Sequence, residues 1–246
     1  MTPAVKTLNK SDLNRWHAYV LDQLEEQRRL TVRHPERPVG PAITFSYETG
    51  SGARDIAHQV ASLLEAAKPP AQGRWKVFDR QLVEQVIEEH HLPKRLAKFM
   101  IEDRRSYLDD VLDELAGLRP PSWVLVPKIV ETIQHLVETG HVILLGRGAN
   151  LVTAETPNVF HVRLVGSLPN RIKRVQDAEQ LSPEAAAKFV ARSDRGRWRF
   201  AKAYFHGELK DDLQYHIVLN TDRVPLSQAA ELIAIAAQKC FVSSVA

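Results

Sequence analysis

The stretch ITFSYETGSGARDIA, residues 43–57, joins a strand pattern to a helix pattern through a glycine-rich turn. Ile43 and Phe45 alternate with polar residues, whereas Ile56 and Val60 follow at helical spacing. Phosphate-binding loops occupy such strand-to-helix turns, because the N–H groups that open a helix favour an anion. The stretch therefore predicts an α/β fold and raises the question of whether its turn binds phosphate.

The turn departs from the P-loop pattern GxxxxGK[ST]. With Gly52 as the second glycine, Tyr47 stands at the first glycine, Ala53 at the lysine and Arg54 at the hydroxyl residue. The backbone can still present amide groups at the start of the helix, and Arg54 can add a positive charge. Two interpretations stay open at this point: a phosphate cradle made of backbone, and an ordinary strand-to-helix turn.

Four further segments have the short, β-branched pattern of strands buried on both faces: residues 75–79, 142–146, 159–165 and 215–220. Segments of helical periodicity separate them, so right-handed crossovers can join parallel strands. The sequence predicts a three-layer α/β/α sandwich around a five-stranded parallel sheet.

A proline-rich stretch separates an N-terminal extension from the main domain. Residues 11–30 have the spacing of an amphipathic helix, and the prolines and glycine of residues 34–41 then end it. We expect an extension over residues 1–38 and one α/β domain over residues 39–246. The extension is a candidate surface for a homodimer.

Helix boundary residues mark the long connections of the main domain. Residues 93–140 have an all-helical pattern, whose last helix is predicted to start at Ser122 and to stop at Gly140. Ser167 and Ser182 are the predicted N-caps of two helices between the fourth and fifth strands.

The composition limits the classes of partner. The 246 residues are 44% hydrophobic, enough for one sizeable core. The formal charge is only +3 and the basic residues are spread over many segments, which fits a small anionic ligand better than nucleic acid. The single cysteine, Cys240, favours a reducing compartment. We expect a cytoplasmic protein with no membrane partner, because no apolar run reaches the length that spans a bilayer.

Arg147 is the first candidate ligand-binding residue. It lies between Gly146 and Gly148, just after a predicted strand, and ligands of open α/β sheets bind at that end of the strands. Arginines between glycines also occur in solvated loops. We interpret Arg147 as ligand-facing, because the flanking glycines carry no side chains that would block close approach.

A second group of arginines lies between the last two predicted strands. Arg171 and Arg174 are three residues apart on one helical face, as are Asp194 and Arg197, so each pair can reach one target. Arg192 belongs to the same basic stretch. Charge-rich helices are usually solvated, but phosphotransferases insert a lid over the phosphates at such a position.

The order of these segments resembles the cytidylate kinase-like family, relatives of bacterial cytidylate kinase within the P-loop nucleoside monophosphate kinases. The family's loop runs roughly S-R-E-x-G-S-G-G, and residues 46–53 here are SYETGSGA. The other matching segments follow in the same order: FDRQLV at 78–83, GRGAN at 146–150, LPNRIKRV at 168–175, the Asp194-x-x-Arg197 pair and LNT at 219–221. The ordered set covers residues 41–238 and is much more specific than any one segment.

The resemblance implies phosphoryl transfer from ATP, with Mg²⁺, to a nucleoside monophosphate such as CMP or a similar small acceptor. It implies a helical acceptor insert at about residues 93–140 and a lid at about residues 167–210. The residues implied at the donor phosphates are Gly50, Ser51, Gly52, Ala53 and Arg54. Arg147 would hold the acceptor phosphate, Arg171, Arg192 and Arg197 would close over the transferring group, and Asn220 and Thr221 would approach the base.

Three positions depart from the family's pattern. Tyr47 replaces the arginine of the family's loop, and Ala53 replaces the last glycine of that loop. Gly148 stands where cytidylate kinases carry an aspartate. Asp79, at the end of the second strand, is the best candidate for the carboxylate that organises Mg²⁺, and it is an equally good helix N-cap. The alternative function is therefore a nucleotide-binding sensor that has lost catalysis.

Overall fold

The computed structural model describes residues 40–67, 74–79, 82, 86, 88–91 and 122–243. In this part of the chain, five parallel strands form one sheet in the order β2-β3-β1-β4-β5. The strands are β1 (Ala42–Tyr47), β2 (Lys76–Phe78), β3 (Val142–Leu145), β4 (Val159–Val165) and β5 (Ile217–Asn220). The predicted five-stranded parallel sheet is confirmed, whereas the predicted extension lies outside the described residues.

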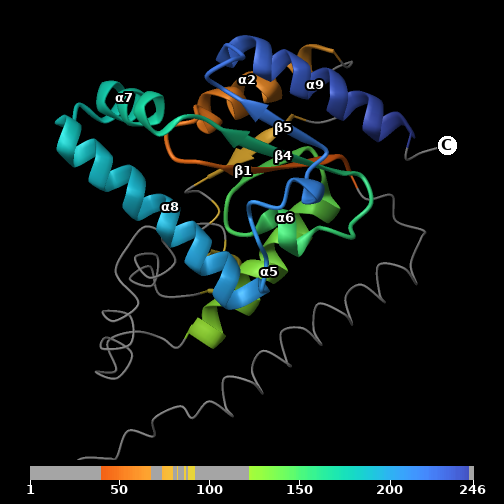
Figure 1. Ribbon diagram of the computed structural model, residues 1–246. Helices are drawn as coiled ribbons and strands as arrows, with labels where there is room; N and C mark the ends of the chain where they lie inside the picture. Colours follow the sequence, from red (N-terminus) through yellow and green to blue (C-terminus); the bar gives the residue numbers. More distant parts are fainter. Residues whose placement is uncertain are drawn as a thin grey trace, which may run out of the picture.

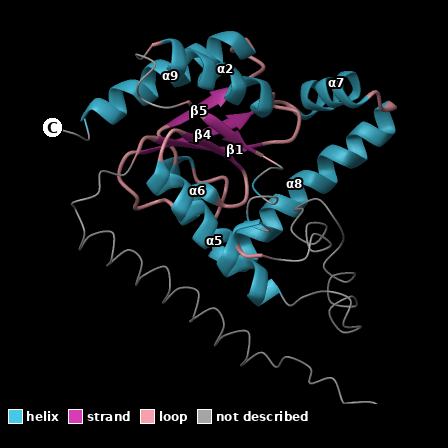
Figure 2. Ribbon diagram, turned by 180° about the vertical axis from the view of Figure 1, so that it is seen from behind, coloured by secondary structure: helices cyan, strands magenta, loops and turns pink. Residues whose placement is uncertain are grey.

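Helices cover both faces of the sheet (Figure 1). They are α2 (Ala53–Ala66), α5 (Ser122–Thr139), α6 (Ala149–Val152), α7 (Leu168–Glu179), α8 (Pro183–Phe205), the short 3₁₀ helix η3 (Asp212–Gln214) and α9 (Leu226–Ser243). Helices α2 and α9 lie on one face and α5 and α6 on the other, and the view from behind in Figure 2 shows the same layers. Helices α7 and α8 lie beyond the carboxyl ends of the strands.

Side chains alternate between the two faces of the central strand and build two cores. Ile43 and Phe45 of β1 pack in a cluster with apolar residues of α2 and α9. Ala42 packs in a second cluster with apolar residues of α5. Burial of one large apolar side chain contributes about 1.5–3 kcal/mol, so these clusters hold the three layers together.

The two outer strands are less buried than the sequence pattern predicts. The residues of β2 are exposed or half-buried, and exposed and half-buried residues alternate along β5, where Val218 is 38% exposed. The prediction that every strand is covered on both faces is wrong for these two. Both are edge strands, so each has a neighbouring strand on one side only.

The predicted helix boundaries lie close to the observed ones. Helix α5 begins at Ser122, and Gly140 follows its last residue with a left-handed φ of 77°. A Cβ at Gly140 would lie 2.4 Å from Gly40 Cα, so close packing also requires glycine there. Ser182 caps α8 by accepting a hydrogen bond from the Ala185 N–H at 3.3 Å, while Ser167 at the N-cap of α7 makes no such side-chain bond.

Candidate functional site

The glycine-rich loop between β1 and α2 is a tight turn. The Ser51 N–H donates to the Glu48 carbonyl and the Ile56 N–H to the Gly52 carbonyl, both at 3.0 Å. Gly50 and Gly52 both have a φ of 83°, which favours glycine. A Cβ on Gly50 would lie 2.3 Å from the Arg171 carbonyl oxygen, so glycine also lets α7 approach the loop.

The loop delivers the backbone of α2 to the carboxyl end of the sheet. Gly52 is the N-cap of α2 and no side chain caps the helix there. Beside it, the Ser51 hydroxyl is buried and has no hydrogen-bond partner. Ala53, the first residue of α2, contributes no charge. Uncapped amides and an unpartnered hydroxyl are groups that a phosphate can satisfy, so the loop is compatible with the first of the two interpretations, a cradle made of backbone.

A carboxylate from α8 reaches this loop. Oδ1 of Asp194 accepts hydrogen bonds from the N–H and the hydroxyl of Thr49, each at 2.8 Å. Arg171 donates to Oδ2 at 2.7 Å and Arg197 to Oδ1 at 2.5 Å. Burial would raise the pKa of Asp194, but the Thr49 N–H, Arg197 and Arg171 outweigh it and lower that pKa. An internal anion thus occupies the donors at Thr49.

Both arginines of α7 contact the glycine-rich loop, as their three-residue spacing predicts. Arg171, which is 7% exposed, donates to the Thr49 carbonyl and to the Gly166 carbonyl, each at 3.0 Å. Arg174 donates to the Gly50 carbonyl at 3.3 Å. These bonds fasten α7 to the loop, so the two arginines also have a structural role.

The residues at the end of β5 complete this cluster. The Thr221 carbonyl accepts a hydrogen bond from Arg174 at 2.6 Å, and the buried Thr221 hydroxyl donates to the Val165 carbonyl at 3.2 Å. The Asn220 side chain accepts from the Asp222 N–H at 2.9 Å. Asn220 and Thr221 therefore order the turn after β5.

Asp79 is paired with Arg54. The carboxylate follows β2 and accepts hydrogen bonds from both Nε (3.1 Å) and Nη2 of Arg54, in the first turn of α2. This bond to Asp79 raises the pKa of Arg54. No group of three His, Cys, Asp or Glu side chains in the described part of the chain could hold a metal ion. The structure thus gives Asp79 an ion pair that neither sequence interpretation anticipates.

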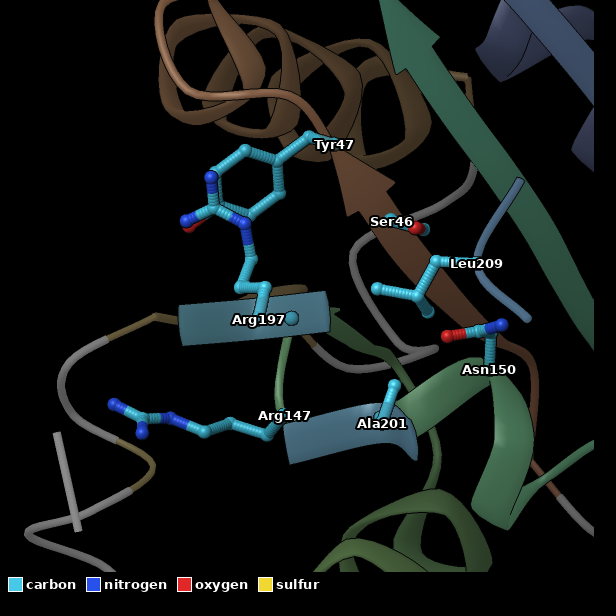
Figure 3. Close-up of a pocket in the computed structure, with 9 residues that line it drawn as sticks. Ser46, Tyr47, Arg147, Asn150, Arg197, Ala201 and Leu209 are labelled. Carbon is cyan, nitrogen blue, oxygen red and sulfur yellow. The ribbon is translucent and has the colours of Figure 1, made fainter. Parts of the chain in front are cut away.

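A pocket lies beside this cluster, under α8 and next to the ends of β1 and β3 (Figure 3). It is lined by Ser46, Tyr47, Gly146, Arg147, Gly148, Asn150, Arg197, Ala201 and Leu209. The Arg197 guanidinium lies over the Tyr47 ring, 4.6 Å from its centroid. The space that a water-sized molecule can reach in the pocket is only about 10 Å³, room for about one water molecule. Helix α8 thus leaves little room in it.

Arg147 follows β3 and lines this pocket, and it is buried rather than exposed as an arginine of a solvated loop would be. Its φ is 58° and it is only 7% exposed. Figure 3 shows its side chain extending away from Ser46, Asn150 and Leu209. The sequence correctly predicts its place at the end of the strand, whereas its burial depends on packing between segments distant in sequence.

Arg192 lies apart from the buried arginines. It is exposed on α8, with its guanidinium 5.9 Å from the centroid of the Phe189 ring. Trp198 of the same helix is 44% exposed, whereas Phe200, Tyr204 and Phe205 pack against the cluster that includes the apolar residues of α5. The structure therefore brings Arg171 and Arg197 together, and it leaves Arg192 outside that group.

A buried network under the pocket was missed by sequence reasoning. Arg163 of β4 donates a hydrogen bond to Ser46 Oγ at 3.0 Å, and its guanidinium lies 5.6 Å from the centroid of the Tyr215 ring. The Tyr215 hydroxyl donates to the Leu209 carbonyl at 2.9 Å and accepts a long bond from Asn150 at 3.4 Å. The available signal was an arginine inside a strand whose other residues, apart from His161, are apolar.

A family model and one solved structure agree with this fold. The model of the cytidylate kinase-like family matches residues 42–223. The crystal structure of an uncharacterized protein from Eubacterium ventriosum superimposes with a TM-score of 0.59 at 17% identity, covering 81% of this chain and 98% of that one. A crystal structure from Thermus thermophilus gives a TM-score of 0.43 at 16% identity, covering 82% of this chain and 98% of that one.

One curated protein has local similarity. The chain is 31% identical over 91 residues to a uronate isomerase of Corynebacterium glutamicum. The match covers 37% of this chain and 18% of the length of that protein.

Proposed function

The chain belongs to the cytidylate kinase-like family, and we propose that it is an ATP-dependent phosphotransferase that acts on a nucleoside monophosphate, CMP-like, or a similar small acceptor. One observation carries the proposal: Arg147, Arg171 and Arg197 are 7%, 7% and 8% exposed and lie around the glycine-rich loop and its neighbouring pocket. Phosphoryl transfer requires mainly positioning and charge neutralisation, which buried arginines and loop amides supply.

The residues have distinct proposed roles. The amides of residues 50–54 bind the donor phosphates at the start of α2, where Ser51 has an unpartnered hydroxyl. Arg147 holds the acceptor phosphate in the pocket, while Arg171 and Arg197 neutralise the group in transfer. Asn220 and Thr221 lie at the end of β5, the strand that pairs with β4, and order the turn that approaches the base.

Mg²⁺ is expected to arrive with the nucleotide rather than to occupy a preformed protein site. The best carboxylate candidate, Asp79, is ion-paired with Arg54, and the described residues offer no cluster of metal ligands. Mg²⁺ often binds through substrate phosphates and one or two carboxylates. Because the donor set here does not form a metal site, the roles proposed above depend on the side chains and amides of the chain.

Catalysis on this scheme requires α8 to move. Asp194 occupies the donors at Thr49, Arg171 and Arg197, and α8 narrows the pocket below the usual size of a ligand site. We infer that α7 and α8 form a lid, closed here on an internal carboxylate, which opens for the nucleotide and closes again over its phosphates.

A second candidate is a nucleotide-binding sensor without turnover. Ala53 stands at the position of the P-loop lysine, and Tyr47 replaces an arginine and binds Arg197 by a cation–π contact. Both changes remove a cation from the place where phosphates are expected. They weaken catalysis more than they weaken binding by loop amides.

Turnover and binding measured on one preparation separate the two candidates. ATP and Mg²⁺ are supplied with CMP, UMP, dCMP or AMP, and calorimetry measures the affinity for each nucleotide. Turnover with any acceptor supports the phosphotransferase, whereas tight binding of ATP or CMP without turnover supports the sensor. Absence of nucleotide binding contradicts both, and affinity for nucleic acid that falls steeply with salt would identify a nucleic-acid binder instead.

A further inference from the structure

Arg163 is a buried cation in the middle of the sheet. It lies directly opposite Ser46 in the parallel pairing of β4 with β1, and it is 6% exposed. Its guanidinium donates to Ser46 Oγ at 3.0 Å and lies beside the Tyr215 ring. Both contacts are with neutral groups.

The charge of Arg163 is not balanced by an ion pair. None of the ion pairs in the described part of the chain includes it. Tyr215 cannot serve as a counter-anion at neutral pH, because burial raises the pKa of its phenol. A charge that is removed from water without a partner destabilises the fold by several kcal/mol, so its presence here calls for a compensating role.

Ser46 connects this charge to the pocket. Its hydroxyl accepts the bond from Arg163 and is hydrogen-bonded to the Tyr215 side chain, and Ser46 is one of the lining residues. Asn150 and Arg147, both less than 10% exposed, line the same pocket. This side of the pocket is therefore polar, and the buried positive charge of Arg163 lies directly behind it, which favours an oxyanion over a neutral group.

We propose that Arg163 is a positioning residue of the acceptor pocket that acts through Ser46 and selects an acceptor bearing an oxyanion, a phosphate or a carboxylate, over a neutral molecule of the same shape. The proposal rests on the proposed function, since it specifies the acceptor of the phosphotransferase. A bound oxyanion neutralises the buried charge of Arg163. The free energy that the ligand-free protein loses by burying this charge is then recovered as affinity for the ligand.

The test measures stability and anion binding in the same variants. Arg163→Met removes the charge and keeps an apolar side chain of similar length, and Arg163→Lys keeps the charge. Arg74→Met is the matched control, because it removes an exposed arginine just before β2, away from the carboxyl ends of the strands, and changes the net charge equally. Calorimetry at constant ionic strength gives the affinity for inorganic phosphate and for acetate, and thermal unfolding gives the stability.

We expect Arg163→Met to weaken phosphate binding at least tenfold and to unfold no earlier than the wild type. Arg74→Met should change neither the phosphate affinity nor the stability. Arg163→Lys should restore part of the affinity, and Ser46→Ala should lose part of it. The proposal is overturned if Arg163→Met fails to fold or unfolds earlier, if it binds phosphate like the wild type, or if the wild type binds neither anion. Absence of nucleotide turnover would count against the proposed function alone, because phosphate binding does not depend on it.

Discussion

Two places with buried arginines lie at the carboxyl end of this sheet, and among the described residues a carboxylate pairs with them at the first place but not at the second. At the glycine-rich loop, Arg171 and Arg197 contact the carboxylate of Asp194 at 2.7 Å and 2.5 Å. At the pocket floor, Arg163 contacts a hydroxyl and an aromatic ring. The first group is balanced by the chain itself, whereas the second leaves a positive charge for a ligand to balance.

This difference indicates that Arg171 and Arg197 stabilise the observed packing of α7 and α8, whereas Arg163 acts on the neighbouring pocket. An ion pair with several charge-assisted hydrogen bonds fixes the relative positions of α7, α8 and the loop. A buried cation beside a pocket contributes little to the closed structure and much to the field inside the pocket. Substitutions in the first group should therefore reduce stability first, and those in the second should reduce binding first.

The largest effect on stability is expected from Arg171→Met. The guanidinium donates hydrogen bonds to two backbone carbonyls and to the Asp194 carboxylate, and its removal leaves these three acceptors without this donor. Breaking one side of a buried ion pair costs about 3–5 kcal/mol. Urea unfolding should show a loss of this size, and Lys173→Met, an exposed change on the same helix, should show almost none. A loss below 1 kcal/mol would mean that the pair with Asp194 does not fasten the lid.

The polar pair next to Ser46 and Arg163 should make the fold sensitive to acid. Thr44 and His161 face each other two residues earlier along β1 and β4, with 2.7 Å between Thr44 Oγ1 and His161 Nδ1. Burial, followed by the neighbouring His216, lowers the pKa of His161 from 6.5 to about 4. Because the unfolded chain binds this proton more readily, the stabilisation is complete above pH 6.5 and is lost as the pH falls toward 4.

The free energy of unfolding should fall by about 3 kcal/mol between pH 7 and pH 4 through this histidine. Denaturant titrations of the wild type and of His161→Asn over this range measure the difference between the two slopes. Parallel pH profiles would show that the His161 imidazole is not held neutral by the fold.

Asp194→Asn should leave Arg171 and Arg197 without a counter-charge, which is the situation of Arg163. The amide keeps the shape of the carboxylate but no longer neutralises Arg171 and Arg197, so stability should fall by about 2 kcal/mol at pH 7. Affinity for inorganic phosphate should rise about tenfold, because the competing internal anion is gone. Asp177→Asn, an exposed change on α7, is the control for net charge. Unchanged phosphate affinity would show that Asp194 does not occupy an anion site.

The sequence predicted the strands and helices that carry these arginines, but it did not predict which groups balance the charge of each arginine. Strand and helix periodicity located the sheet, the glycine-rich loop and the end of β3, and the three-residue spacings correctly paired Arg171 with Arg174 and Asp194 with Arg197. The contact of Thr49 with Asp194 joins residues 145 positions apart, and no local pattern encodes it. The sequence shows Arg163 only as a charged residue in a mostly apolar strand. Whether it forms an ion pair depends on the residues that pack around it in the fold, most of which are distant in sequence.

The smallest effect is expected from Arg192→Met, which tests where the lid site ends. The family resemblance implies that Arg192 closes over the transferring group, but here it is exposed beside Phe189, on a different side of α8 from the buried Arg197. An exposed arginine of this kind contributes less than about 0.5 kcal/mol to stability. Unfolding midpoint and phosphate affinity should both stay at the wild-type value, and so should any turnover that is found. A tenfold loss of turnover with unchanged affinity would instead show that α8 rotates about its axis during closure, which would bring Arg192 to the phosphates and make the arrangement seen here an inactive one.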